Sequence, residues 1–434
     1  MNQLQRILDE LVNNEKTGHA GFNNYSPETI RALMRRLGQP QSGFESVHIA
    51  GTNGKGSTAY MISRILMAAG YKTGLYISPH LEKVTERISI DGRPVAEKRL
   101  VTILRDILHQ SRIASLRPTW FDALTAAAFQ YFDRESVDIA IVETGLGGRL
   151  DSTNVIRPLV SVITTVSLDH LSILGKTLLE ISAEKAGIIK HRVPVVAGNI
   201  AGGALAVIES TTREKRSRLY VMEKDFSIDA SAHTDQGAFS YMFGNRRIEN
   251  LRLAAPGVFQ RTNAALAITA TLLLGRKGFT VAPRDIRVAL GRLVIPGRLE
   301  IISKKPLIIF DPAHNLEALD AIVNYISGEY PGRKPVFVVC FMKDKDIKGL
   351  FEILYAVNPA AIVYYQIDDE RVFNPDSSRP ESDGVPFYVI SGKDADSRLR
   401  TTIVRLGGDD RIIVATGSFR LYTAVKKLAL NLSE

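Results

Sequence analysis

Short runs of apolar, β-branched residues alternate with segments of helical period along most of this chain, and this alternation constrains its fold more than any other feature. The apolar runs have the length of buried strands and occupy residues 47–50, 75–78, 139–143, 161–166 and 193–197. Helical patterns lie between them, for example at residues 57–69 and 124–132. Strands that alternate with helices predict a mainly parallel sheet with helices on both faces, so the sequence indicates an α/β fold.

Two features divide this pattern. Residues 218–253 hold short strand-like pieces with polar turns, which predicts a small antiparallel insertion. Pro296-Gly297 separates two patterned regions, and beyond it the alternation restarts. We therefore expect a larger domain over residues 1–295 and a smaller, doubly wound, Rossmann-like domain over residues 296–434. Its strands are expected at residues 307–311, 336–340, 361–365, 387–390 and 412–416, and residues 368–383 are expected to form an exposed loop.

Composition excludes several classes of protein. The 55 basic and 46 acidic residues give a net charge of +9, without the long basic block that would indicate nucleic-acid binding. No apolar run is long enough for a membrane span, and the N-terminus lacks the pattern of a signal peptide. The single cysteine, Cys340, lies in an apolar run and is expected to be buried. We expect a cytoplasmic monomer that binds neither nucleic acid nor membrane.

A glycine-rich loop joins the strand at 47–50 to the helix that follows it. It reads Gly51-Thr52-Asn53-Gly54-Lys55-Gly56-Ser57. Such a loop lets backbone N–H groups approach phosphates at a helix N-terminus, where Lys55 can reach the β- and γ-phosphates and Ser57 can ligate Mg²⁺. The match to the common phosphate-loop pattern is partial, because Ile49 replaces the first glycine and Gly56 separates Lys55 from Ser57. A glycine-rich turn with an exposed lysine is the alternative.

These departures are shared with a known family. The loop resembles that of the Mur ligase superfamily and, more narrowly, that of folylpolyglutamate synthase and dihydrofolate synthase. Further motifs of this family follow in order, and they are Ser78-Pro79-His80-Leu81, Glu86-Arg87-Ile88, Glu143-Thr144-Gly145-Leu146-Gly147-Gly148-Arg149-Leu150-Asp151, Asp169-His170, Glu184-Lys185-Ala186-Gly187-Ile188, Pro296-Gly297-Arg298 and Asp311-Pro312-Ala313-His314-Asn315.

The resemblance implies an ATP-dependent carboxylate–amine ligase in which two domains close over the substrates. ATP would phosphorylate a folate or dihydropteroate carboxylate, and the amine of L-glutamate would attack the acyl phosphate. Two Mg²⁺ ions would neutralise phosphate charge. Whether one or both folate steps are catalysed stays open.

The resemblance also implies roles for individual residues. Those expected to bind ATP are Thr52, Asn53, Gly54, Lys55, Gly56, Ser57, Asn263, Arg298 and Asp311. Those expected to hold metal are Ser57, Ser78, Glu143, His170 and Lys185, the last as a carbamate. Lys55, Lys185 and His314 are expected to be catalytic.

Without the resemblance, plainer roles are open for several of these residues. His170 would be a loop histidine and Lys185 a surface lysine paired with Glu184. Arg298 would be an exposed boundary arginine, and Asp311 a helix cap.

The acceptor side departs most from the family. The residues expected to line a pterin pocket are Thr119, Trp120, Phe121, Asp122, Leu150, Asp151 and Ser152. Trp120 and Phe121 would stack on the pterin or belong to the core. Asp122 stands where the family usually has Glu, and residues 19–26 also differ from the family pattern.

Two further functions remain as alternatives. Another Mur-type ligase, acting on a different acid, usually carries an extra N-terminal domain, whereas only about 46 residues precede the loop strand here. A nucleotide-binding protein without catalysis is the other alternative. The presence of Lys55, Glu143, His170 and Lys185 together argues against it.

Overall fold

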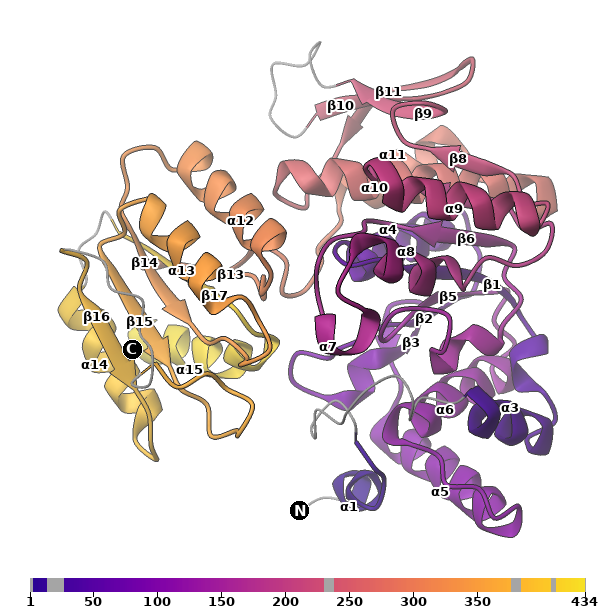
Figure 1. Cartoon of the computed structure of the whole chain (residues 1–434), viewed down its shortest axis with the longest axis horizontal. Coiled ribbons are helices and arrows are strands. Elements are labelled where there is room, and N and C mark those ends of the chain that lie inside the picture. The colour runs from indigo at the N-terminus through magenta and orange to yellow at the C-terminus, as the bar shows by residue number, and fades with distance from the viewer. Residues whose placement is uncertain (1–2, 14–26, 230–237, 376–383, 407–410, 434) are drawn as a thin grey trace. The chain divides into compact units, whose positions relative to one another are not determined.

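The computed structural model describes residues 3–13, 27–229, 238–375, 384–406 and 411–433, which form two compact units (Figure 1). Unit 1 comprises Met1–Ala254 and Gln260–Leu293. Unit 2 comprises Ala255–Phe259 and Val294–Glu434.

Unit 1 is built on an eight-stranded sheet in the order β4-β3-β2-β5-β1-β6-β7-β8. Its strands are β1 (Glu45–Ala50), β2 (Thr73–Tyr76), β3 (Ile88–Ile90), β4 (Arg93–Pro94), β5 (Ile139–Glu143), β6 (Val160–Ile163), β7 (Val195–Ala197) and β8 (Leu219–Val221). The strands from β2 to β8 in this order pair in parallel, whereas the β2–β3 and β3–β4 pairs are antiparallel. The predicted mainly parallel sheet is confirmed.

Helices cover this sheet. They are α1 (Gln3–Asp9), α3 (Pro27–Arg36), α4 (Lys55–Ala68), α5 (Glu97–Ile113), α6 (Trp120–Arg134), α7 (Leu171–Leu174), α8 (Leu178–Ala186), α9 (Gly202–Glu214), α10 (Val258–Leu274) and α11 (Pro283–Gly291). One cluster of buried residues joins α1, α3, α5 and α6 to β2 and β5. Among the described residues, none of the helices has the length and apolarity needed to cross a membrane.

The central strand β1 is buried at every position after Glu45, although its sequence includes the polar residues Ser46 and His48. Val47 and Ile49 are fully buried, and so is His48 between them. A strand with neighbours on both sides and helices on both faces has no exposed positions, so the alternating pattern of a half-exposed strand is absent. The carboxyl ends of β1 and β5 lie side by side, because Ile49 pairs with Glu143. This edge carries the candidate site.

The predicted antiparallel insertion is present over most of its length. β9 (Phe226–Asp229), β10 (Ala238–Phe243) and β11 (Arg246–Arg252) form a separate antiparallel sheet. β8 lies within the predicted insertion but pairs in parallel with β7, so it extends the main sheet instead.

Unit 2 holds a six-stranded sheet in the order β12-β13-β17-β14-β15-β16. Its strands are β12 (Glu300–Lys304), β13 (Leu307–Phe310), β14 (Pro335–Val339), β15 (Ala361–Tyr365), β16 (Phe387–Ile390) and β17 (Ile412–Thr416). All pair in parallel except β12, which is an antiparallel edge strand.

In the described part of unit 2, the sheet is flanked by the α-helices α12 (Leu316–Glu329), α13 (Ile347–Ala356), α14 (Ala395–Leu406) and α15 (Tyr422–Ser433). α12 packs with α13 and α14 with α15, and Figure 1 shows the two pairs on opposite sides of the sheet. This is the doubly wound arrangement that the alternation predicted.

The segment at 368–383 differs from the expected exposed loop in the part that is described. Val372 and Phe373 are buried, and the Tyr364 hydroxyl donates a hydrogen bond to the Phe373 carbonyl (2.8 Å). The segment packs beside the end of β14, where Met342 forms a bridge with Val372. Cys340 is buried there, as expected, and burial raises the pKa of its thiol to about 12.

Candidate active site

The glycine-rich loop connects β1 directly to α4. The helix begins at Lys55, and its N-cap residue, Gly54, has a left-handed conformation with φ 82°. This turn points the first N–H groups of α4 toward the edge of the sheet, where the helix dipole adds partial positive charge. The loop therefore has the backbone arrangement of an anion site.

The end of β6 holds the loop in place. The Thr52 N–H donates to the Thr165 carbonyl (2.9 Å), and the Thr164 hydroxyl donates to the Asn53 carbonyl (2.6 Å). A β-carbon on Gly51 would lie 1.8 Å from the Thr164 hydroxyl oxygen. The first glycine of the motif is thus required for close packing against β6.

Lys55 folds back over this loop. Its ammonium donates hydrogen bonds to the carbonyls of Gly51 (3.0 Å) and Thr52 (3.2 Å). The charge therefore lies above the same backbone that would cradle phosphates. From this position a lysine can neutralise the negative charge on the phosphates of a nucleotide.

Helix α10 supplies two further polar side chains. The Gln260 side-chain nitrogen lies 3.4 Å from the Ser57 hydroxyl, and the Asn263 side-chain amide donates to Gln260 Oε1 (2.9 Å). Asn263 also borders Gly54, whose β-carbon position lies 2.3 Å from its side-chain oxygen. Sequence reasoning identified Asn263 and missed Gln260. The signal was the spacing of three residues, which places both on one face of a helix.

Glu143 lies at the carboxyl end of β5, beside the start of α4. It is buried, and its Oε2 accepts a hydrogen bond from the Ser78 N–H (3.1 Å). A β-carbon on Gly56 would lie 3.4 Å from the same oxygen. The fold thus brings three of the predicted positions, Ser78, Glu143 and the start of α4, to one point.

Lys185 is buried on α8, so the surface lysine considered as an alternative is wrong. Burial, together with the nearby charge of Lys55, lowers the pKa of its ammonium to about 7, although Asp169 and Glu184 oppose this shift. An amine with this pKa is substantially neutral near pH 7. Glu184 forms its ion pair with Arg149 instead (2.8 Å).

His170 begins the short helix α7 in a left-handed conformation with φ 50°. Its side chain is partly exposed, and its backbone N–H donates to the buried Asp169 carboxylate (2.8 Å). Asp169 also contributes to the electrostatic surroundings of Lys185. His170 therefore lies in the region of Lys185, while its predicted role in metal binding stays a prediction.

The glycine-rich loop after Glu143 packs between two parts of the site. A β-carbon on Gly145 would lie 2.5 Å from the Phe121 ring, and one on Gly148 would lie 2.9 Å from the Glu184 carbonyl oxygen. The Arg149 N–H donates to that same carbonyl (2.8 Å). This loop links the start of α6 to the Lys185 helix.

The acceptor-side residues near the start of α6 divide into a hydrogen-bonded polar group, Thr119, Asp122 and Ser152, and an aromatic pair, Trp120 and Phe121. Thr119 and Asp122 form a capping box at the start of α6, and Asp122 also accepts a hydrogen bond from the Ser152 hydroxyl (2.6 Å). Trp120 is buried beneath the Arg87 guanidinium, 4.6 Å from the ring centre, so it belongs to the core. Phe121 is partly exposed beside Tyr76.

Leu150 and Asp151 close the second glycine-rich loop. Leu150 is half-buried, whereas Asp151 is buried and accepts hydrogen bonds from the backbone of Leu146 (2.9 Å) and Thr153 (2.9 Å). The Asp151 carboxylate therefore holds the loop. The predicted segment at 19–26 lies outside the described residues.

The predicted residues of unit 2 gather at the carboxyl end of β13. Asp311 accepts hydrogen bonds from the N–H groups of Leu299 (3.0 Å) and Ala313 (3.1 Å). Burial raises the pKa of its carboxyl group, and Arg298 opposes this rise. The Arg298 guanidinium lies 5.0 Å from the centre of the Phe419 ring, a neighbour that sequence reasoning did not identify.

His314 lies in the same cluster. Its Nδ1 lies 2.8 Å from the Pro312 carbonyl oxygen, which can only accept, so Nδ1 carries a proton and Nε2 faces away. The ring centre is 6.5 Å from that of Phe419. Arg298 is therefore not simply an exposed boundary arginine, and Asp311 is not simply a helix cap. Both residues belong to one cluster with His314.

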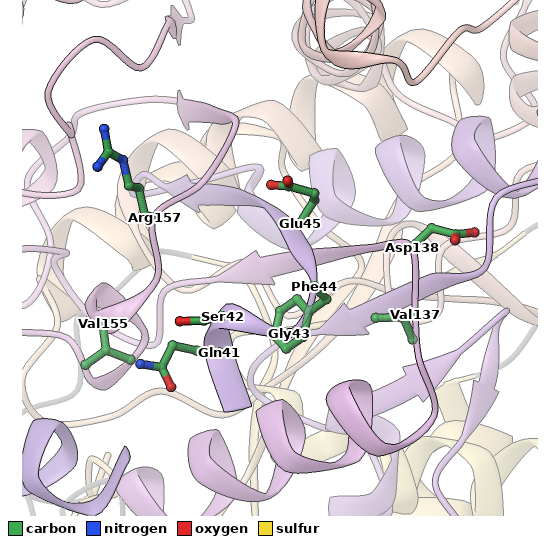
Figure 2. Close-up of a pocket in the computed structure, with 9 residues that line it drawn as sticks. All are labelled: Gln41, Ser42, Gly43, Phe44, Glu45, Val137, Asp138, Val155 and Arg157. Carbon is green, nitrogen blue, oxygen red and sulfur yellow. The ribbon is translucent and has the colours of Figure 1, made fainter. Parts of the chain in front are cut away.

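A separate open pocket of about 410 Å³ lies at the amino ends of β1 and β5, where Figure 2 shows Glu45 and Asp138. Its lining includes none of the predicted site residues. The candidate site instead occupies the carboxyl edge of the sheet, where ligands bind in open α/β folds.

Comparison with known proteins is consistent with this geometry. Residues 49–271 match the family described as "Mur ligase middle domain". Folylpolyglutamate synthase of Lacticaseibacillus casei is 35% identical over 411 residues, covering 93% of this chain and 94% of the relative. The dihydrofolate synthase/folylpolyglutamate synthase of Bacillus subtilis is 32% identical over 419 residues, covering 92% and 93%.

Solved structures show the same similarity. Folylpolyglutamate synthase of Mycobacterium tuberculosis, complexed with ADP and AMPPCP, has a TM-score of 0.86 at 30% identity and covers 98% of this chain and 97% of its own. An FPGS–AMPPCP–folate complex has a TM-score of 0.83 at 32% identity, covering 99% and 100%. With its phosphate loop, Glu143 and Lys185 gathered at one edge of the sheet, this chain belongs to the folylpolyglutamate synthase and dihydrofolate synthase family of Mur ligases, which are ATP-dependent carboxylate–amine ligases.

Proposed function

We propose that this chain joins L-glutamate to the terminal carboxylate of a folate-type acceptor, using ATP to form an acyl phosphate. The observation that carries the proposal is the grouping of Lys55, Glu143 and Lys185 around a phosphate loop, in a chain 35% identical to a folylpolyglutamate synthase over 93% of its length. These residues supply what phosphoryl transfer to a carboxylate needs, namely neutralised charge and positioned reactants.

Unit 1 would hold the triphosphate and its metal. The backbone of Thr52, Asn53, Gly54 and Gly56 lies at the N-terminus of α4, and Lys55 lies over it. Neutralising the γ-phosphate makes it a better target for the acceptor carboxylate, which is itself an anion. Asn263 and Gln260 would contact the nucleotide beside the loop.

The residues present fit Mg²⁺. The hydroxyls of Ser57 and Ser78 and the carboxylate of Glu143 are oxygen donors of the kind that Mg²⁺ prefers, and His170 would complete the set. A bound Mg²⁺ supplies charge neutralisation to the phosphates. A second ion would need another anionic ligand on the Lys185 side.

Lys185 fits the role of that ligand as a carbamate. Its neutral amine would add to CO₂, forming an N–C bond and releasing one proton, so that an uncharged buried amine becomes an anionic carbamate. Two observations favour this: the amine is buried, and its pKa is lowered to about 7. Carbamate formation requires the unprotonated amine, which an ordinary lysine rarely provides at pH 7.

The acceptor and glutamate would use the remaining residues. Phe121 is the partly exposed ring beside the second glycine-rich loop, and it would stack on the pterin. In unit 2, Arg298 and Asp311 would contact ATP, and His314 would orient the acyl phosphate or the glutamate. The complexes of relatives with AMPPCP and folate support ATP and folate as ligands.

A substrate panel tests the proposal. The protein is incubated with Mg·ATP and L-glutamate, and tetrahydrofolate, dihydropteroate or a muramoyl nucleotide is supplied in turn. Glutamate-dependent release of phosphate, with a new amide product by mass spectrometry, is expected with one or both pterins. A product only with the muramoyl nucleotide would instead assign another Mur-type reaction, and no product would contradict a ligase.

We also propose that the protein acts as a cytoplasmic monomer, since ATP and glutamate are available in that compartment. Light scattering coupled to size-exclusion chromatography is expected to give a mass near the 47.8 kDa of one chain. A mass of twice that value at assay concentrations would contradict the monomer.

A further inference from the structure

A buried chain of hydrogen bonds joins the strand before the phosphate loop to the second glycine-rich loop. His48, in the middle of β1, lies 2.8 Å through Nε2 from the Thr153 hydroxyl oxygen. That hydroxyl donates to Asp151 Oδ1 (2.5 Å), and Asp151 Oδ2 accepts from the Leu146 N–H (2.9 Å). All three side chains are buried.

Burial raises the pKa of Asp151, and the hydrogen bonds from Thr153 and Leu146 oppose this rise. With Asp151 as the carboxylate that accepts these bonds, the donor at each step follows. A hydroxyl has one proton, and Thr153 gives it to Asp151, so its oxygen can only accept from His48. Nε2 of His48 therefore carries the ring proton. Nδ1 is buried and has no hydrogen-bond partner among the described residues, which suits a bare nitrogen far better than a protonated one.

The electrostatic surroundings agree with a neutral ring. Burial lowers the pKa of His48 well below its usual value, and the charge of Lys190 lowers it further. His48 is therefore a fixed neutral donor whose single proton orients the Thr153 hydroxyl toward Asp151.

At the other end, Asp151 determines where the second glycine-rich loop lies. Beyond the Leu146 N–H, this carboxylate also accepts the Thr153 N–H (2.9 Å) at the start of the short 3-10 helix η4 (Ser152–Val155). The loop it holds packs its Gly145 against Phe121 and its Gly148 against the Glu184 carbonyl. A shift of this loop would move the acceptor side and the Lys185 helix together.

We propose that His48 and Thr153 are positioning residues for the ligase reaction, acting through Asp151 on the loop between Glu143 and Leu150. Neither residue touches a reacting group. They hold the loop so that Phe121 and Lys185 stand at the correct separation across it. The expected effect on ligase turnover rests on the proposed function, whereas the expected effect on the position of the loop does not.

Two matched pairs of variants test it. Thr153→Val keeps the shape of the side chain and removes the hydroxyl, whereas Thr153→Ser keeps the hydroxyl. His48→Gln places an amide near the position of Nε2, whereas His48→Asn is one methylene shorter and falls short of Thr153. Every variant is first checked for a cooperative thermal transition, so that only folded protein is compared.

We expect Thr153→Val, which removes the hydrogen bonds of Thr153 to both Asp151 and His48, and His48→Asn, which removes only the bond to Thr153, each to lower kcat/KM for the acceptor by roughly tenfold. KM for ATP should change less than about twofold, and Thr153→Ser and His48→Gln should restore most of the activity. Because the residues act in one chain, the double variant His48→Asn/Thr153→Val should lose little more than either single one. Equal kcat/KM in Thr153→Val and Thr153→Ser would overturn the proposal.

A measurement on the unliganded protein is independent of turnover. In ¹⁵N NMR spectra, His48 should show a protonated Nε2 and a bare Nδ1, and the Leu146 amide should exchange slowly with solvent. Thr153→Val should accelerate that exchange by at least about tenfold, while Thr153→Ser should not. A protonated Nδ1, or unchanged Leu146 exchange in Thr153→Val, would refute the inference even if the protein proves to be a ligase. If the wild type ligates nothing, the proposed function fails and this measurement still decides the structural inference.

Discussion

Gly54 lies so close to Asn263 that a β-carbon on the glycine would sit 2.3 Å from the side-chain amide oxygen of Asn263. Gly54 also has φ 82°, a conformation that L-residues avoid. The turn into α4 therefore depends on a missing side chain for two independent reasons.

Gly54→Ala should weaken ATP binding by at least about tenfold, because the new methyl group must displace either the loop or Asn263. Isothermal titration with a non-hydrolysable ATP analogue measures this. Gly70→Ala is the matched control, since Gly70 has φ 92° but no atom within 4 Å of its β-carbon position. It should lose about 1 kcal/mol of stability and no nucleotide affinity. Equal affinity in the two variants would show that the contact with Asn263 is unimportant.

Lys55→Ala should lower kcat by at least about a hundredfold, because it removes the charge that lies over the phosphate loop. The side chain is only half-buried and bonds to its own loop, so the thermal midpoint should change little. Lys98→Ala, at an exposed position on α5, is expected to behave as the wild type. Turnover retained by Lys55→Ala would mean that this loop does not bind the nucleotide.

Glu143→Gln should raise the Mg²⁺ concentration needed for half-maximal activity by at least about tenfold. The substitution keeps the size of the side chain at the end of β5 and removes its charge. A Mg²⁺ titration of the initial rate checks this, with Glu135→Gln, at a partly exposed carboxylate paired with Arg99, as the control. An unchanged Mg²⁺ dependence would remove Glu143 from the proposed metal ligands.

Lys185 predicts a pH dependence of stability. Its pKa of about 7 in the folded protein lies below the usual lysine value of roughly 10.4, so the unfolded chain binds more protons between these pH values and stability rises with pH across that window. The cost of the buried amine is thus greatest below pH 7. Lys185→Met removes it, and the gain in unfolding free energy should be roughly 2 kcal/mol larger at pH 6 than at pH 9.

Denaturant unfolding in CO₂-free buffer at the two pH values measures this difference, since carbamate formation is then prevented. The same variant should be inactive as a ligase. A gain that is equal at both pH values would show that Lys185 does not carry a lowered pKa.

The sequence predicted best those elements whose pattern is local. The strands expected at 361–365 and 412–416 coincide with β15 and β17, because buried parallel strands are continuous apolar runs. The edge strand β12 was not predicted. All its residues are exposed or half-buried, and its pairing with β13 depends on the neighbouring strand more than on its own composition.

In the candidate site, too, local features could be predicted from the sequence and long-range contacts could not. The end of β1, the glycines of the loop and Lys55 lie within about ten residues, so the glycine-rich loop between strand and helix could be predicted from the sequence. The contact between Gln260 and Ser57 joins residues 203 positions apart, and that between His48 and Thr153 spans 105. Contacts of this kind arise from the packing of helices and strands that are distant in sequence, which local periodicity does not specify. The hydrogen bonds by which the Asp151 carboxylate holds a loop were likewise not predicted, and its role in lining a pocket stays a prediction.

Trp120 is the only tryptophan in the sequence, and it lies at the start of α6 beneath the guanidinium of Arg87. Its emission therefore comes from a single buried indole in unit 1, next in sequence to Phe121, while unit 2 contributes no tryptophan signal at all. The native chain thus carries an intrinsic optical probe that distinguishes its two units. A denaturation curve followed by this fluorescence reports the loss of unit 1 alone, whereas circular dichroism reports both, and any gap between the two curves measures how independently the units unfold.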